Sequence, residues 1–142
     1  MPQNESVERF RLLTEDLKRT VHQNAVNELN EQTNYLKDII ASVAPVYHGP
    51  SLPGVDPGAL RASVKVVQDR SKDTVVRIVA GGPTTIHPAG TPYDYARGVE
   101  FGTHNMRAEP FFFPTYRLLK KKIIAGMKRR ITREITKYSA KD

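Results

Sequence analysis

The sequence predicts an α+β domain in which two long helices pack against a small antiparallel β-sheet. An amphipathic helical pattern occupies each end of the chain, and two short runs of β-branched residues lie between them. Because helices and strands do not alternate along the chain, the sheet is expected to be antiparallel rather than parallel. With 142 residues, the chain has room for a single domain with one modest core.

The first element is a long helix within residues 1–44, with its clearest pattern over Ser6–Ala44. Its apolar residues recur every three or four positions and so share one face, with polar residues opposite. Pro45 is expected to end the helix. The helix would be roughly 57 Å long, which exceeds the core of a small domain, so part of its apolar face is expected to pack against a neighbouring subunit. A break over Asn30–Asn34 would instead give two shorter helices.

The middle of the chain is expected to hold a β-hairpin at residues 63–80. Ser63–Val67 and Thr74–Val79 are rich in β-branched residues, and a polar turn separates them. Segments rich in proline and glycine flank this hairpin. Residues 45–62 are expected to form a loop and a helical turn, and residues 81–93 a long loop of the kind that often carries contacts.

The last part of the chain contains a short element and a second long helix. Within residues 94–113, a stretch with helical spacing is followed by a predicted short strand over Glu100–Thr103. Residues 114–139 repeat apolar residues at steps of three and four, which predicts a second amphipathic helix. Between Thr115 and Asp142, ten basic side chains stand against two acidic ones, so this segment carries +8 in a chain whose total charge is +7.

The basic face of the second helix is compatible with several environments. It can be a solvated surface, or it can contact nucleic-acid phosphates, a membrane surface or an acidic protein. Aromatic side chains are not interleaved with the basic ones, which argues against stacking on single-stranded nucleic acid. The helix also lacks a recognition-helix motif for duplex DNA.

No residue pattern predicts catalysis, and neither a cofactor nor a metal is expected. The chain has no cysteine, which excludes disulfides and thiolate ligands. His87, Asp94, Glu100 and His104 lie near one another in the sequence but form no ligand motif, so they are interpreted as surface polar residues. No apolar run approaches the roughly 20 residues that cross a bilayer, and the N-terminus lacks a secretory signal. We therefore expect a protein that is not an enzyme and is made in the cytoplasm.

Two segments go beyond generic composition. Residues 55–63 read V-D-P-G-A-L-R-A-S, and residues 95–103 read Y-A-R-G-V-E-F-G-T, continued by M-R-A-E-P-F at residues 106–111. They resemble the V-D-T-G-x-L-R-x-S, Y-A-x-x-V-E-F-G-T and M-x-A-x-P-F elements of a family of neck and tail-completion proteins, also described as tail components, of long-tailed bacteriophages. Pro57 replaces a threonine of that pattern, and Phe112-Phe113 replaces Leu-Arg, which removes an arginine that could pair across an interface.

The resemblance implies a structural virion protein that forms a homo-oligomeric, hexameric ring in the phage neck or at the top of the tail. Its partners would be head-completion and tail proteins, with genomic double-stranded DNA passing through in at most weak, non-specific contact, and no membrane. The alternative from another class is a small DNA- or RNA-binding protein acting through its C-terminal helix. An enzyme such as a nuclease or hydrolase is the third hypothesis. Self-assembly into rings would indicate the virion protein, salt-sensitive affinity for nucleic acid would indicate the nucleic-acid-binding protein, and substrate turnover would indicate the enzyme.

The motif residues also have structural interpretations of their own. Gly58 and Gly102 are expected to allow tight backbone geometry, and Leu60, Val99 and Phe101 are expected to enter the core. These five residues form the predicted motif core.

A second set of residues is expected to meet another subunit or a partner. Glu100, between two apolar residues of the predicted strand, would point away from the core toward a basic residue of the same or the next subunit. Three consecutive phenylalanines cannot all face one core, so at least one is expected at an interface. The candidate interface residues are therefore Glu100, Phe111, Phe112, Phe113, Lys120, Lys121 and Lys122.

Overall fold

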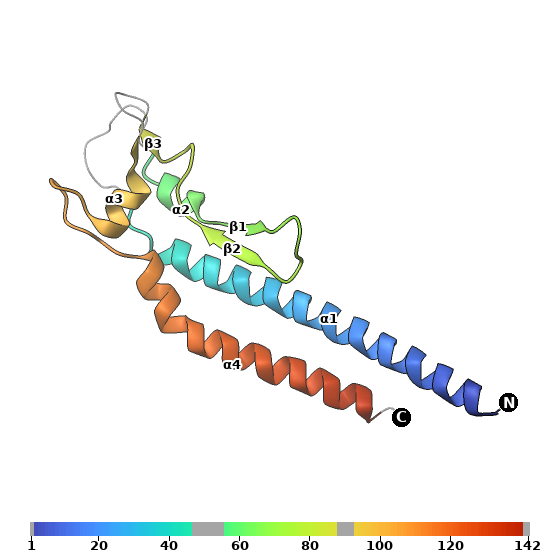
Figure 1. The fold of residues 1–142 in the computed structure, drawn as a ribbon. Coiled ribbons are helices and arrows are strands. Elements are labelled where there is room, and N and C mark those ends of the chain that lie inside the picture. The colour runs from blue at the N-terminus through green and yellow to red at the C-terminus, as the bar shows by residue number, and fades with distance from the viewer. Residues whose placement is uncertain (1, 47–55, 88–92, 141–142) are drawn as a thin grey trace.

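The computed structural model describes residues 2–46, 56–87 and 93–140. Two long helices, α1 (Pro2–Val43) and α4 (Phe112–Ser139), run antiparallel, and the smaller elements gather at one end of this pair (Figure 1). The N-terminus of α1 and the C-terminus of α4 lie at the opposite end. The predicted α+β class, with two helices and a small antiparallel sheet, is confirmed.

The N-terminal helix α1 is continuous from Pro2 to Val43, so the alternative break over Asn30–Asn34 does not occur. Polar side chains in such a stretch can compete with helical hydrogen bonds. Here Thr33 Oγ1 donates instead to Leu29 O, one turn earlier in the same helix, at 2.6 Å. The helix ends just before Pro45, as predicted.

A short helix and a hairpin follow α1. Helix α2 (Ala59–Ser63) leads into β1 (Lys65–Gln68), which pairs antiparallel with β2 (Val76–Val79) and places Lys65 opposite Val79. The predicted hairpin is therefore confirmed, with strands slightly shorter than the β-branched runs. Much of the predicted proline- and glycine-rich loop before α2, residues 47–55, lies outside the described residues.

The segment predicted as a plain long loop contains a second, very short sheet. Strand β3 (Ile86–His87) pairs antiparallel with β4 (Tyr93–Asp94), and residues 88–92 between them lie outside the described part of the chain. Helix α3 (Tyr95–Phe101) follows β4 directly. The strand predicted over Glu100–Thr103 is wrong, because its first two residues form the last turn of α3.

The core lies at the end of the helix pair where the small elements gather. Two residues of α1 and Ala44, just after its end, stand at four-residue steps and form one side of the core, and residues from α2, its C-terminal boundary, α3 and the position before α4 cover them: Leu36, Ile40, Ala44, Leu60, Val64, Ala96 and Phe111. Within the described residues, no side chain of α1 before Glu28 is fully buried. The remote halves of α1 and α4 are therefore arms that extend from the packed end.

Candidate assembly surfaces

The second motif fixes where α4 begins. Glu100 of α3 is only 7% exposed, and its carboxylate accepts hydrogen bonds from the backbone N–H groups of Phe111, Phe112 and Phe113 at 2.8, 3.0 and 3.0 Å. The first N–H groups of a helix lack partners within the helix, and a negative charge beside them is favourable. The predicted place of Glu100 on an exposed strand face is wrong, because α3 aims this carboxylate at amides of its own chain rather than at a neighbouring subunit.

The residues on either side of Glu100 have different environments. Gly102 has a φ of 76°, and a Cβ there would lie 3.0 Å from Ala108 N, so the predicted tight geometry is confirmed. Val99 packs against the core, as predicted. Phe101 is 64% exposed, so its predicted core position is wrong. On a helix, the residue after the inward-pointing Glu100 is rotated by about 100° and points outward.

The three consecutive phenylalanines separate in burial. Phe111 is 3% exposed and belongs to the core, Phe112 is half-buried, and Phe113 is 41% exposed. The ring of Phe113 lies 6.0 Å from that of Phe101, centroid to centroid, beside a hollow of 330 Å³ between β2, α3 and the start of α4. The expectation that the three rings cannot share one core is confirmed. Contact of the exposed pair with another subunit stays a prediction.

The first motif joins α2 to the end of α1. Leu60 is 3% exposed and lies in the core, as predicted. Arg61 Nε donates to Ala44 O at 2.9 Å, which satisfies a carbonyl left open at the end of α1. Ser63 Oγ accepts a hydrogen bond from Gly81 N at 2.9 Å. The arginine and serine of the motif therefore connect elements of the fold, a role that the local sequence pattern does not indicate.

The glycines with positive φ angles lie outside the first motif. Gly58 has a φ of −92°, and a Cβ there would make only an ordinary contact, so the predicted special geometry is wrong. Gly81 and Gly82 instead have φ values of 95° and 126°. Asp94 holds this turn by accepting from Gly82 N at 2.8 Å and from Thr85 Oγ1 at 2.7 Å, and it also caps α3. An aspartate just before residues with helical spacing was the signal for this cap.

The lysines predicted for an interface are exposed on α4 but point to different sides. Lys120 Nζ lies 5.6 Å from the centre of the Tyr116 ring, and Lys121 is exposed. Lys122 lines a groove of 750 Å³ between α1 and α4, which we call the cationic groove; it is lined by Tyr35, Lys122, Ile123, Gly126, Arg129 and Arg133, among others. Within the described residues, no ion pair reaches the cations Lys122, Arg129 and Arg133.

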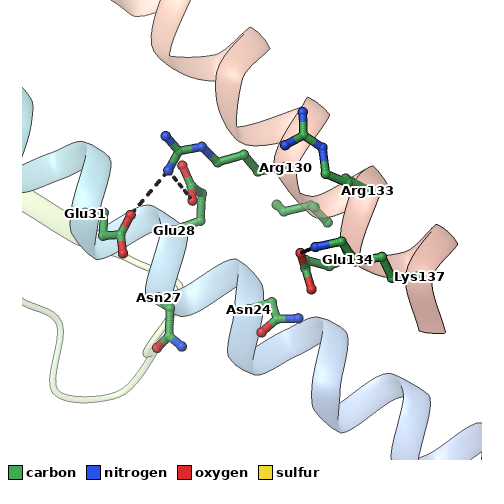
Figure 2. Close-up of a pocket in the computed structure, with 9 residues that line it drawn as sticks. Asn24, Asn27, Glu28, Glu31, Arg130, Arg133, Glu134 and Lys137 are labelled. Atoms are coloured by element: carbon green, nitrogen blue, oxygen red, sulfur yellow. Dashed lines mark hydrogen bonds and ion pairs between the residues drawn. The ribbon is translucent and has the colours of Figure 1, made fainter.

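Polar side chains hold the arms together at a distance from the core. Figure 2 shows Arg130 of α4 reaching across to α1, where its guanidinium lies 3.1 Å from Glu28 and 3.3 Å from Glu31. A hollow of 260 Å³ remains between the helices at this point. Further along, the Tyr138 hydroxyl donates to Asp16 at 2.6 Å. Polar contacts therefore join the two arms at both of these points.

Helix α1 continues past the end of α4 (Figure 1). Because Tyr138, near the end of α4, meets Asp16, the residues of α1 before that contact project beyond α4. We call residues 4–15 the α1 tip; its large apolar side chains are 42 to 72% exposed, namely Val7, Phe10, Leu12 and Leu13. The core of the chain thus leaves part of the apolar face of α1 uncovered, as predicted. A neighbouring subunit as its cover stays a prediction.

The described residues contain no group of three or more side chains that could hold a metal, and no helix among them is long and apolar enough to cross a membrane. Asp94 and Glu100 bond backbone amides, and His104 is exposed; the side chain of His87 lies outside the described part. No protein-family model, curated protein or solved structure matches the chain. Its function is therefore inferred from its own residues and surfaces.

Proposed function

We propose that the chain is a structural virion protein that forms a homo-oligomeric ring, hexameric by expectation, in the neck or at the top of the tail of a long-tailed phage. The ring would join head-completion and tail proteins around the passage for double-stranded DNA. The observation that carries the proposal is the resemblance of residues 95–103 and 106–111 to the Y-A-x-x-V-E-F-G-T and M-x-A-x-P-F elements of phage neck and tail-completion proteins.

Exposed apolar side chains support a subunit that assembles. Phe10 is 72% exposed among the other apolar side chains of the α1 tip, and Phe101 is 64% exposed beside Phe113, whose ring centroid lies 6.0 Å away. Large exposed apolar patches often mark contact sites in proteins. A ring subunit needs two different surfaces, because each head-to-tail contact joins one patch to another. The chain offers apolar groups at both ends of its long axis.

The fold gives such a subunit a fixed internal geometry. The motif residues Arg61 and Glu100 tie the end of α1 and the start of α4 to the packed end of the molecule. From there α1, with 42 residues, extends over roughly 62 Å. The function proposed is therefore geometric, since a ring of such subunits would seal a joint and present one surface to the head and another to the tail.

A nucleic-acid-binding protein acting through α4 is the second candidate. The cationic groove favours it, because Lys122, Arg129 and Arg133 have no acidic partner among the described residues. In a ring that passes DNA, however, each phosphate contact would resist sliding. The ring proposal therefore expects duplex DNA affinity that is weak, independent of sequence and lost as salt approaches physiological levels.

Light scattering over a concentration series, electron microscopy of the particles and mass spectrometry of purified virions test the proposal. We expect ring-like oligomers, or a subunit found in virions at the neck or tail top. A strict monomer that is also absent from virions would overturn the proposal. Submicromolar, sequence-selective binding to duplex DNA at physiological salt would favour the nucleic-acid-binding candidate instead.

A further inference from the structure

We infer that the α1 tip of one copy docks in the cationic groove of the next copy, with Leu12 entering the space above Gly126. The inference rests on the proposed function, because it assigns the contact that joins neighbouring copies in the ring. It pairs two surfaces for which the described residues of a single copy provide no cover.

One face of the α1 tip combines an apolar side chain with acidic ones. Glu5, Glu8, Leu12 and Glu15 follow one another at steps of three and four residues, so they share a side of the helix. Leu12 is 59% exposed. Among the described residues no ion pair reaches Glu5 or Glu8, and Glu15 pairs only with exposed Arg11 at 3.5 Å. We call this side the acidic face.

The cationic groove has the complementary arrangement. Its floor contains Tyr35, which is 46% exposed, and Gly126, where an added Cβ would meet no atom within 4 Å. Its rim on α4 carries Lys122, Arg129 and Arg133, which stand seven and four residues apart and so lie along one flank of the helix. Leu12, with Glu8 and Glu15 one turn away on either side and Arg9 at the edge of this face, thus meets a floor whose rim carries three cations beside Glu31.

The groove fits this helix better than it fits a nucleic-acid backbone. An extended phosphate chain would place its charges over the floor at Tyr35 as well as along the cationic rim. A helix with an acidic face buries its apolar residue on the floor and directs its carboxylates to the rim. Helix-in-groove docking of this kind is a common mode of recognition between proteins.

The contact must join two copies rather than two parts of one copy. Leu12 and Tyr35 lie on the same continuous helix, and their separation of 23 residues corresponds to about 35 Å along its axis. When each tip docks in the groove of the next copy rather than being exchanged between two copies, the contact is head-to-tail and closes into a ring if successive copies are related by rotation alone.

Cysteine crosslinking in the full-length chain tests the inference directly, since the chain has no cysteine of its own. A Leu12→Cys variant is mixed with a Gly126→Cys variant under mild oxidation, and the mixed disulfide is identified by mass. The matched control replaces Gly126→Cys with Lys128→Cys, an exposed position about 200° around the same helix. We expect the Leu12–Gly126 pair to crosslink about tenfold faster than the control, because a disulfide forms only when two Cα atoms approach within about 7 Å.

A charge swap provides the second arm. Changing Glu5 and Glu8 to Lys on the Leu12→Cys chain should slow the crosslink, as should changing Lys122 and Arg129 to Glu on the Gly126→Cys chain. Combining the two altered chains should restore it, because each rim position again faces the opposite charge.

The outcomes separate this inference from the proposed function. Equal rates for the Gly126 and Lys128 pairs, or no Leu12–Gly126 crosslink at any protein concentration, would overturn the docking even if ring particles are seen. Suppression of the crosslink by submicromolar duplex DNA at physiological salt would assign the groove to phosphates and also overturn it. Selective crosslinking by a protein that forms no ring and is absent from virions would retain the docking and reject the neck function.

Discussion

Replacing Glu100 with Gln tests whether the cap supplied by the second motif stabilises the fold. The substitution keeps the size of the side chain but removes its charge and turns one acceptor oxygen into an NH₂ donor. In the structure, Oε2 accepts from Phe111 and Phe112 while Oε1 accepts from Phe113. At least one of these three N–H groups therefore loses its acceptor in the variant.

The expected loss follows from those contacts. A hydrogen bond to a charged group contributes about 1.5–3 kcal/mol, and a carboxylate near a helix N-terminus about 0.3–2 kcal/mol. Since Gln keeps one acceptor oxygen, we expect the free energy of unfolding to fall by about 2–3 kcal/mol. For a chain of this size, that corresponds to a decrease in Tm of roughly 6–9 °C.

Thermal and urea unfolding, followed by circular dichroism at one fixed protein concentration, measure the effect while the protein concentration that enters any association equilibrium stays the same. Glu109→Gln is the matched control, because Glu109 is exposed and lies in the same segment; its effect should stay within about 0.5 kcal/mol. If wild type, Glu100→Gln and Glu109→Gln unfold together, the cap contributes no stability. Unchanged melting with lost assembly would return Glu100 to the interface.

Three further predictions concern other parts of the molecule. Urea unfolding should show that Phe101→Ala lowers stability by less than about 1 kcal/mol, and buried Phe111→Ala by about 3–5 kcal/mol; equal losses would contradict the assigned burial. Changing Lys120, Lys121 and Lys122 to Glu should leave the melting temperature unchanged but reduce the joining of phage heads to phage tails in a complementation assay. Normal joining would count against a partner contact of these lysines. Burial, aided by the nearby carboxylates of Asp56 and Asp94, raises the pKa of the Tyr95 phenol above its ordinary 10.0. Because folding favours the neutral phenol, this group stabilises the fold below pH 10.0, and the stabilisation is lost as the pH rises through the raised pKa. Tyr95→Phe should lose less stability there, whereas a decline parallel to wild type would refute the cause.

The long elements were predictable because their signal is repeated many times. The N-terminal helix was predicted over Ser6–Ala44 and found over Pro2–Val43, and the hairpin strands differ from the β-branched runs by a few residues. Each such element shows the same periodicity at several successive positions, so one atypical residue does not change the interpretation. The core position of Leu60 was predicted instead from a single apolar residue of the first motif, inside a short helical turn.

The second motif was misread because its local pattern fits two structures. In Val99-Glu100-Phe101 a polar residue stands between two apolar ones, which is the alternation of a strand. The decisive partner of Glu100 is the start of α4, which lies eleven residues away for the nearest amide. The order of apolar and polar residues in a short stretch of sequence carries no information about that partner. Neither the burial of the Glu100 carboxylate nor the exposure of Phe101 was therefore predicted.

The two motifs and the two helical arms have different roles in this molecule. Motif residues such as Arg61, Ser63, Glu100 and Gly102 build the junction where all elements meet, and most of their side chains are committed to contacts within the chain. The two surfaces that we assign to docking between copies lie instead on α1 and α4, outside both motifs, whereas exposed Phe101 belongs to the second motif. A junction of this kind can be retained while the arms change in charge and apolar pattern to fit different neighbours. The Phe112-Phe113 departure fits this division, because the backbone amides that bind Glu100 are available whichever side chains stand there.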